Sequence, residues 1–150
     1  ISMWAGDIKS DNFLLSKIKD AAKDANILDF VESLPKGFDT LVGDRGVLLS
    51  GGQKQRIFIA RELFRKPDLL ILDEATSALD SESERSIQES IDFLNGKITV
   101  IIIAHRLSTI KKVDKIYLLE KGVIIEQGKY DELKSKSDSK FRKLISLQNL

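Results

Sequence analysis

Two short apolar runs constrain the fold of this chain more than any other feature of its sequence. Residues 69–72 are all Leu or Ile, and this run ends at Asp73 and Glu74. Residues 98–104 contain one polar side chain and are followed by His105. Runs of this length are typical of strands that are covered on both faces in a parallel sheet. Because helical patterns precede and separate them, the predicted fold class is α/β with a partly parallel sheet.

Composition and charge exclude several classes of protein. The chain has 150 residues, 42% hydrophobic and 31% charged, as in one globular domain. Its formal net charge of +1 gives no general electrostatic reason to expect nucleic acid as a partner. The absence of Cys excludes disulfides and thiolate metal sites. No apolar run approaches the roughly 18 to 20 residues of a membrane-spanning helix. The chain begins at Ile1 without an initiator Met, so we expect a piece of a longer protein.

Apolar periodicity and turn residues predict the order of the other elements. Apolar residues recur three and four positions apart before Pro35 and predict helical structure over most of the first third of the chain. Lys121 and Gly122 separate two apolar segments and predict a hairpin turn. The remaining predictions are helices over 51–66, from Asp80 or Ser81 to 94, and over 130–147, with strands over 69–72, 98–103, 115–119 and 123–127.

The segment Leu49-Ser50-Gly51-Gly52-Gln53 is the first candidate site. Two glycines at a predicted helix start allow close backbone approach, and the exposed amides with the helix dipole favour an anion such as phosphate. A plainer interpretation is that Ser50 and Gln53 form a capping box and do nothing else. The segment by itself leaves both interpretations open.

The polar residues that follow the two apolar runs are the second candidate site. Asp73 and Glu74 suit a Mg²⁺-nucleotide site, in which one acid holds the metal or its water and the other orients an attacking water. His105 is the only histidine, and it suits contact with a terminal phosphate. An acidic turn, a packing histidine and, for Asp80, a helix cap are the plainer alternatives.

Together these segments resemble the nucleotide-binding domain of an ATP-binding cassette (ABC) protein, and the resemblance covers essentially the whole chain. The matching segments are 49–53 (signature motif), 69–74 (Walker B strand and catalytic Glu), 77–80 (D-loop) and His105 (switch histidine). Residues 40–46 resemble the exporter segment that touches the membrane domains. The resemblance therefore favours an exporter.

The resemblance implies a partial P-loop NTPase fold, a helical subdomain followed by a RecA-like parallel-sheet portion. It divides the chain into a helical and signature subdomain over 1–66, a core with Walker B and the switch histidine over 67–130, and a C-terminal helix over 131–150. It also implies ATP and Mg²⁺ as ligands. The partners would be a second nucleotide-binding domain, in a head-to-tail dimer, and the transmembrane domains of an exporter. The location would be the cytoplasmic face of the cell (inner) membrane, with no nucleic acid partner.

The resemblance also assigns roles to single residues. Leu49, Ser50, Gly51, Gly52 and Gln53 would contact ATP that the partner domain binds. The other assignments are Asp73 as a Mg²⁺ ligand, directly or through water, Glu74 as general base or water-orienting group, His105 as a contact of the terminal phosphate, and Asp80 as part of the D-loop.

One motif of the family is not found in these residues. A phosphate-cradling Walker A loop has the pattern Gly, four residues, Gly-Lys and Ser or Thr, and none of the nine glycines begins it. We therefore expect negligible ATP hydrolysis by the chain alone. The strand that leads into Walker A lies inside the family's sheet, so we also expect an isolated chain to be unstable or to pair its strand edges with a partner.

Two alternative functions stay open. One is the C-terminal lobe of a non-transport ABC ATPase of the chromosome-structure or DNA-repair type. No heptad run precedes the signature, and residues 40–46 favour an exporter. The other is a non-catalytic half-domain that supplies its signature to a partner. The presence of Asp73, Glu74 and His105 argues against that alternative.

Overall fold

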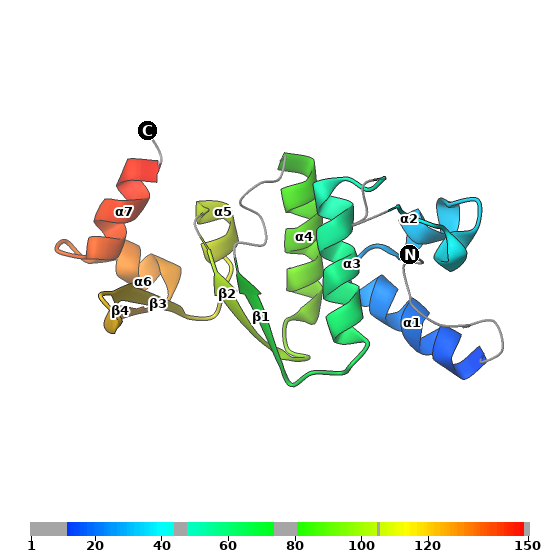
Figure 1. Ribbon diagram of the computed structural model, residues 1–150. Coiled ribbons are helices and arrows are strands. Elements are labelled where there is room, and N and C mark those ends of the chain that lie inside the picture. Colours follow the sequence, from blue (N-terminus) through cyan, green and yellow to red (C-terminus); the bar gives the residue numbers. More distant parts are fainter. Residues whose placement is uncertain (1–11, 44–47, 74–80, 105, 149–150) are drawn as a thin grey trace. The chain divides into compact units, whose positions relative to one another are not determined.

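The computed structural model describes residues 12–43, 48–73, 81–104 and 106–148 (Figure 1). These form two compact units, one ending at Ile103 and one beginning at Ala104. The first unit contains α1 (Asn12–Asp24), α2 (Leu28–Ser33), η2 (Gly37–Asp39), α3 (Gly51–Leu63), β1 (Leu69–Asp73), α4 (Ser81–Leu94) and β2 (Thr99–Ile103). The second contains α5 (Leu107–Ile110), β3 (Ile116–Glu120), β4 (Val123–Gly128), α6 (Tyr130–Ser135) and α7 (Lys140–Gln148). Among the described residues, no helix has both the length and the apolar content that a bilayer crossing requires.

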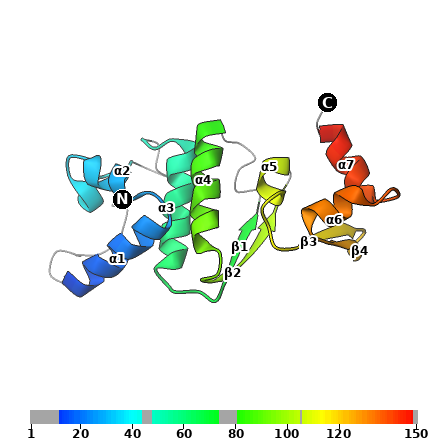
Figure 2. The same ribbon diagram turned by 180° about the vertical axis from the view of Figure 1, so that it is seen from behind.

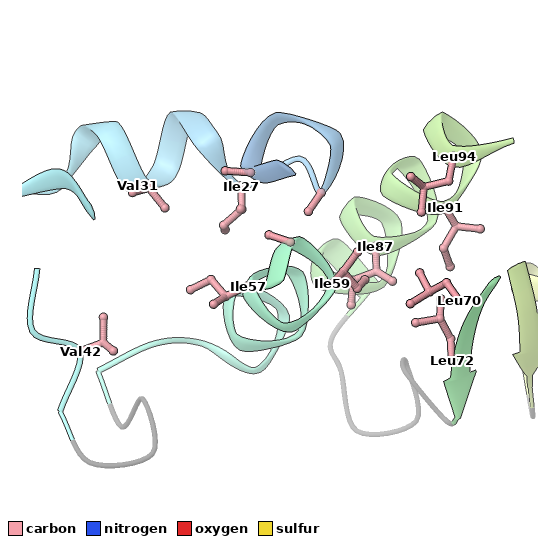
Figure 3. Packing of buried hydrophobic residues seen from close by; sticks show 13 residues of the cluster. Ile27, Val31, Val42, Ile57, Ile59, Leu70, Leu72, Ile87, Ile91 and Leu94 are labelled. Carbon is pink, nitrogen blue, oxygen red and sulfur yellow. The ribbon is translucent and has the colours of Figure 1, made fainter. Parts of the chain in front are cut away.

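The helices of the first unit share one hydrophobic core with the sheet. Figures 1 and 2 show α3 and α4 side by side. In the core, Ile59 of α3 lies with Ile87 of α4, and both are almost completely buried (Figure 3). Leu70 and Leu72 of β1 join the same cluster. The apolar face of each helix thus packs against its neighbours, which stabilises the short helices far more than their intrinsic propensity does.

The strands β1 and β2 pair in parallel, as the two apolar runs predict. Their register runs from Leu69 opposite Thr99 to Asp73 opposite Ile103, so the carboxyl ends of both strands lie at one edge. The α/β class with a parallel strand pair is confirmed.

The prediction that both runs are covered on two faces is wrong for these strands. Leu70 and Leu72 are buried, whereas Leu69 and Ile71 are 46% and 59% exposed. In β2, Ile101 is 48% exposed. The physical reason is that the helices of this unit cover one face of a two-stranded sheet, and the alternate side chains point to the other face.

A left-handed residue follows α1, α3 and α4, whereas α2 ends at the extended residue Leu34. Asn26 (φ 51°) follows α1 and Lys66 (φ 52°) follows α3, which ends at Leu63 and not at the predicted residue 66. Gly96 (φ 75°) lies just after α4, as the predicted Asn-Gly stop requires. In the described residues 12–43, the α-helices α1 and α2 are separated by the turn at Asn26.

In the second unit, β3 and β4 form the predicted antiparallel hairpin. The prediction of one helix over 130–147 is wrong, because two helices, α6 and α7, occupy this range. Lys136 is extended, and the Ser139 hydroxyl accepts a hydrogen bond from the Arg142 amide (3.1 Å) at the start of α7. Serine side chains compete in this way with helix continuation. A second core joins these elements through Ile116, Leu133, Phe141 and Ile145.

Candidate functional site

The structure describes six of the nine predicted site residues. They are Leu49, Ser50, Gly51, Gly52, Gln53 and Asp73. Glu74, Asp80 and His105 lie outside the described residues. The geometry below therefore concerns the beginning of α3 and the carboxyl end of β1.

The first turn of α3 is closed by a reciprocal pair of hydrogen bonds. Ser50 precedes the helix with an extended backbone (φ −64°, ψ 162°), and its hydroxyl oxygen accepts from the Gln53 amide at 3.2 Å. The Gln53 side-chain oxygen accepts in turn from the Ser50 amide at 2.9 Å. The predicted capping box is confirmed. Leu49, just before it, packs against the first core and fixes the entry of the chain into the helix.

The capping box leaves hydrogen-bond donors for an anion. The first four amides of an α-helix have no acceptor within the helix, and here the box satisfies those of Ser50 and Gln53. The amides of Gly51 and Gly52 remain, at the positive end of the helix dipole. Ser50 accepts through its hydroxyl oxygen and so keeps its own O–H as a donor. Capping and anion binding are therefore compatible, and this donor set fits a phosphate group of ATP.

Asp73 is the last residue of β1 and lies opposite Ile103 in the parallel register. Its side chain is exposed at the edge where function gathers in parallel sheets. A carboxylate oxygen in this position fits the ligand preference of Mg²⁺. No group of three or more acidic, His or Cys side chains forms a metal site within the described ranges. Asp73 would thus be one protein ligand of an ion that also needs water or phosphate oxygens.

Sequence reasoning missed a polar cluster that includes a residue of α3, the helix that begins at the capping box. Arg56, in the second turn of α3, donates through Nη1 to the Asn26 carbonyl at 3.0 Å. The Asn26 side-chain amide donates to Glu89 of α4 at 3.3 Å. Burial lowers the pKa of Arg56, and the charge of Glu89 opposes this effect. No spacing rule detects the cluster, because its members are far apart in the sequence.

Comparison with known proteins places this geometry in a family. Residues 5–77 match the family described as "ABC transporter". The heterocyst differentiation ATP-binding protein HepA of Nostoc sp. is 64% identical over 118 residues, which is 79% of this chain and 19% of that protein. The putative multidrug export ATP-binding/permease protein YgaD of Bacillus subtilis is 55% identical over 136 residues, 91% of this chain and 23% of that protein.

A solved structure agrees with these relatives. The structure of a bacterial Atm1-family ABC exporter with ATP bound superposes with a TM-score of 0.78 at 43% identity. The match covers 90% of this chain and 23% of that one. The resemblance seen in the motifs is therefore confirmed, and the chain is homologous to the ATP-binding cassette proteins. More narrowly, its relatives named here include ABC exporters, and it corresponds to part of their nucleotide-binding domain.

Proposed function

We propose that this chain forms part of the ATP-binding and ATP-hydrolysing domain that powers substrate export by an ABC transporter. The observation that carries the proposal is the capped start of α3, where the amides of Gly51 and Gly52 remain available to an anion beside the Ser50 hydroxyl. The chain spans between 9% and 23% of the length of the curated relatives it matches. The activity and partners of the whole protein are accordingly part of the proposal.

The proposed site is shared between two domains in a head-to-tail dimer. Leu49, Ser50, Gly51, Gly52 and Gln53 would contact the terminal phosphate of ATP held by the partner domain. Donors fixed in advance at a helix start stabilise the charge of a transferring phosphoryl group without reorganising. The two glycines allow the phosphate to approach the backbone closely.

The other half of each site would use the polar residues after β1 and β2. Asp73 would hold Mg²⁺, directly or through water, and the ion would neutralise phosphate charge when bound. Glu74 would accept the proton of the attacking water or orient it, and His105 would contact the same terminal phosphate. Asp80 would belong to the D-loop at the dimer interface. The transmembrane domains would contact the exporter-like segment 40–46 at the cytoplasmic face of the inner membrane.

Hydrolysis by this mechanism needs a Walker A loop, and no segment of the 150 residues has its pattern. Phosphoryl transfer depends mainly on positioning and charge neutralisation. We therefore expect negligible ATP turnover by the chain alone. Turnover is expected once the Walker A segment is supplied, either in the same chain or separately.

The test is steady-state ATP hydrolysis by the chain after a Walker A segment has been supplied, in the same chain or separately. We expect Glu74→Gln to lower kcat by about 10² to 10⁴-fold, because it removes a general base. Glu82→Gln makes the same chemical change at an exposed position of α4 and should leave kcat unchanged. Full activity of Glu74→Gln would contradict the catalytic role. If a Walker A helper restored activity to a Glu74→Gln chain, the half-domain alternative would replace the proposal.

A further inference from the structure

We infer that Asn26, Arg56 and Glu89 form a polar clasp that positions the phosphate-contacting start of α3 relative to α4. This inference rests on the proposed function, since it concerns how the Ser50–Gln53 turn is held for its contact with ATP. The three residues come from the end of α1, the middle of α3 and the middle of α4. Each is a positioning residue that acts through the helices and does not touch the nucleotide.

The end of α1 offers two carbonyl groups to the other helices. Asn26 adopts a left-handed conformation (φ 51°), and its amide and that of Ile27 bond back to the carbonyls of Lys23 and Ala22, both at 2.9 Å. This pair of backbone hydrogen bonds closes the helix as a Schellman motif. The next carbonyls along the chain, those of Ala25 and Asn26, then accept from side chains of α4 and α3.

Both carbonyls have specific partners. The Ser90 residue of α4 is completely buried, and its hydroxyl shares its one proton between the Ala25 carbonyl at 3.0 Å and the Ser86 carbonyl of its own helix at 2.9 Å. Arg56 donates to the Asn26 carbonyl at 3.0 Å. The end of α1 is therefore a common anchor for α3 and α4.

Glu89 closes the clasp. One carboxylate oxygen accepts from the Asn26 side-chain amide, and the other accepts from Arg85, both at 3.3 Å. The carboxylate also attracts the Arg56 guanidinium, whose charge is partly removed from water. A desolvated charge is costly unless it is paired and hydrogen-bonded. Arg56 is therefore held by its hydrogen bond to the Asn26 carbonyl, and the nearby charge of Glu89 favours its charged form.

The clasp lies between the start of α3, which would contact the partner's ATP, and α4, the helix that follows the D-loop segment. Arg56 lies five residues after Gly51, roughly 7.5 Å along the axis of one continuous helix. On the other side, α4 begins at Ser81, the residue that follows Asp80. Fastening α3 to α4 through the clasp fixes the direction of the Gly51 and Gly52 amides relative to the helix that follows the D-loop segment.

The test compares kcat and KM for ATP in the site completed by a Walker A segment. Arg56→Lys and Glu89→Gln should each lower kcat about tenfold and change KM less than twofold, because alignment and not initial binding is lost. The double variant should lose no more than either single variant, since both break the same clasp. Asn26→Gly keeps the left-handed turn and the carbonyl acceptor, and should show a smaller loss.

Two control variants separate positioning from stability. Glu62→Gln changes an exposed glutamate on the same helix, which pairs with Arg65 at 3.2 Å, and should leave kcat unchanged. Ile59→Val removes one buried methyl group from the core side of the same helix and changes no polar group of the clasp. If Ile59→Val lowers Tm by as much as Glu89→Gln and also lowers kcat equally, the positioning role is overturned.

A second measurement does not depend on hydrolysis. Amide hydrogen exchange of Gln53, whose N–H donates to Ser50, should accelerate at least tenfold in Arg56→Lys and Glu89→Gln and stay unchanged in Glu62→Gln. Unchanged exchange in all variants would overturn the clasp. If Glu74→Gln has full activity, the proposed function fails and the exchange result alone decides the clasp. If Glu74→Gln is inactive while both clasp variants have normal kcat, only the clasp fails.

Discussion

Glu126 shows how one carboxylate can hold two elements of the second unit together. One of its oxygens accepts from the Ser139 hydroxyl and the other from the Lys140 amide, both at 2.6 Å. The hydrogen bond from Ser139 is the largest cause that lowers the pKa of Glu126, and amides of Lys140 and Phe141 add to it. The side chain of Lys140 also pairs with Glu120 at 2.6 Å. A strand residue thus caps the start of α7.

At the residue scale, the lowered pKa predicts a pH dependence. The pKa of Glu126 is lower in the folded than in the unfolded state, where it is about 4.3. Its stabilising effect is therefore complete above that pH and is lost as the pH falls through the folded-state value. Glu126→Gln should lower the unfolding temperature at pH 7, and this effect should shrink as the pH falls below the unfolded-state pKa and through the lower folded-state pKa. Thermal unfolding from pH 3 to 7 checks this, with Glu62→Gln as control. Equal destabilisation by Glu126→Gln at the two ends of this pH range would contradict the predicted pH dependence.

At the scale of elements, the hairpin between β3 and β4 depends on backbone conformation. Lys121 (φ 49°) and Gly122 (φ 78°) both lie in the left-handed region, as a two-residue turn of this kind requires. A Cβ atom on Gly122 would meet no atom within 4 Å. The turn therefore requires glycine for its conformation and not for space.

Gly122→Ala should destabilise the second unit by about 1 kcal/mol, because a non-glycine residue is strained at this φ. Lys121→Gly relieves the same strain at the neighbouring position and should not destabilise to this extent. Chemical denaturation followed by the signals of Tyr117 and Tyr130, which both lie in this unit, measures the difference. Equal stability of Gly122→Ala and the parent protein would show that the turn has another conformation.

At the scale of the whole molecule, the exposed face of the β1–β2 sheet is an apolar surface that favours association. Leu69, Ile71 and Ile101 are each close to half exposed or more on strands that have one partner each in the described part of the chain. Unpaired edges and apolar faces of this kind promote association between chains. We expect the isolated chain to associate with increasing concentration.

Ile71→Lys should reduce this association, because it places a charge on the exposed face without entering the core. Leu72→Ala, one residue along on the buried face, should instead lower stability by about 2 to 5 kcal/mol and leave the association surface intact. Size-exclusion chromatography with light scattering over a range of concentrations distinguishes the two. A parent chain that stays monomeric and folded at all concentrations would refute the expectation.

Local sequence determined the elements that depend on local physics. The apolar runs predicted the parallel pairing of β1 with β2, and Lys121-Gly122 predicted the hairpin, because apolar periodicity and turn conformation are properties of neighbouring residues. The Ser50–Gln53 box was predictable from a spacing of three residues. The order of the motifs along the sequence also indicated the family. The roles of Glu74, Asp80 and His105 stay predictions, since these residues lie outside the described ranges.

Tertiary structure alone decided the remaining features. The one-sided burial of β1 depends on which helices cover the sheet, and the break between α6 and α7 depends on a carboxylate from β4 that meets Ser139. Arg56 and Asn26 are 30 positions apart, and Asn26 and Glu89 are 63 apart. Contacts at such separations arise only when packing of the helices brings distant segments together, so no local pattern in the sequence encodes them.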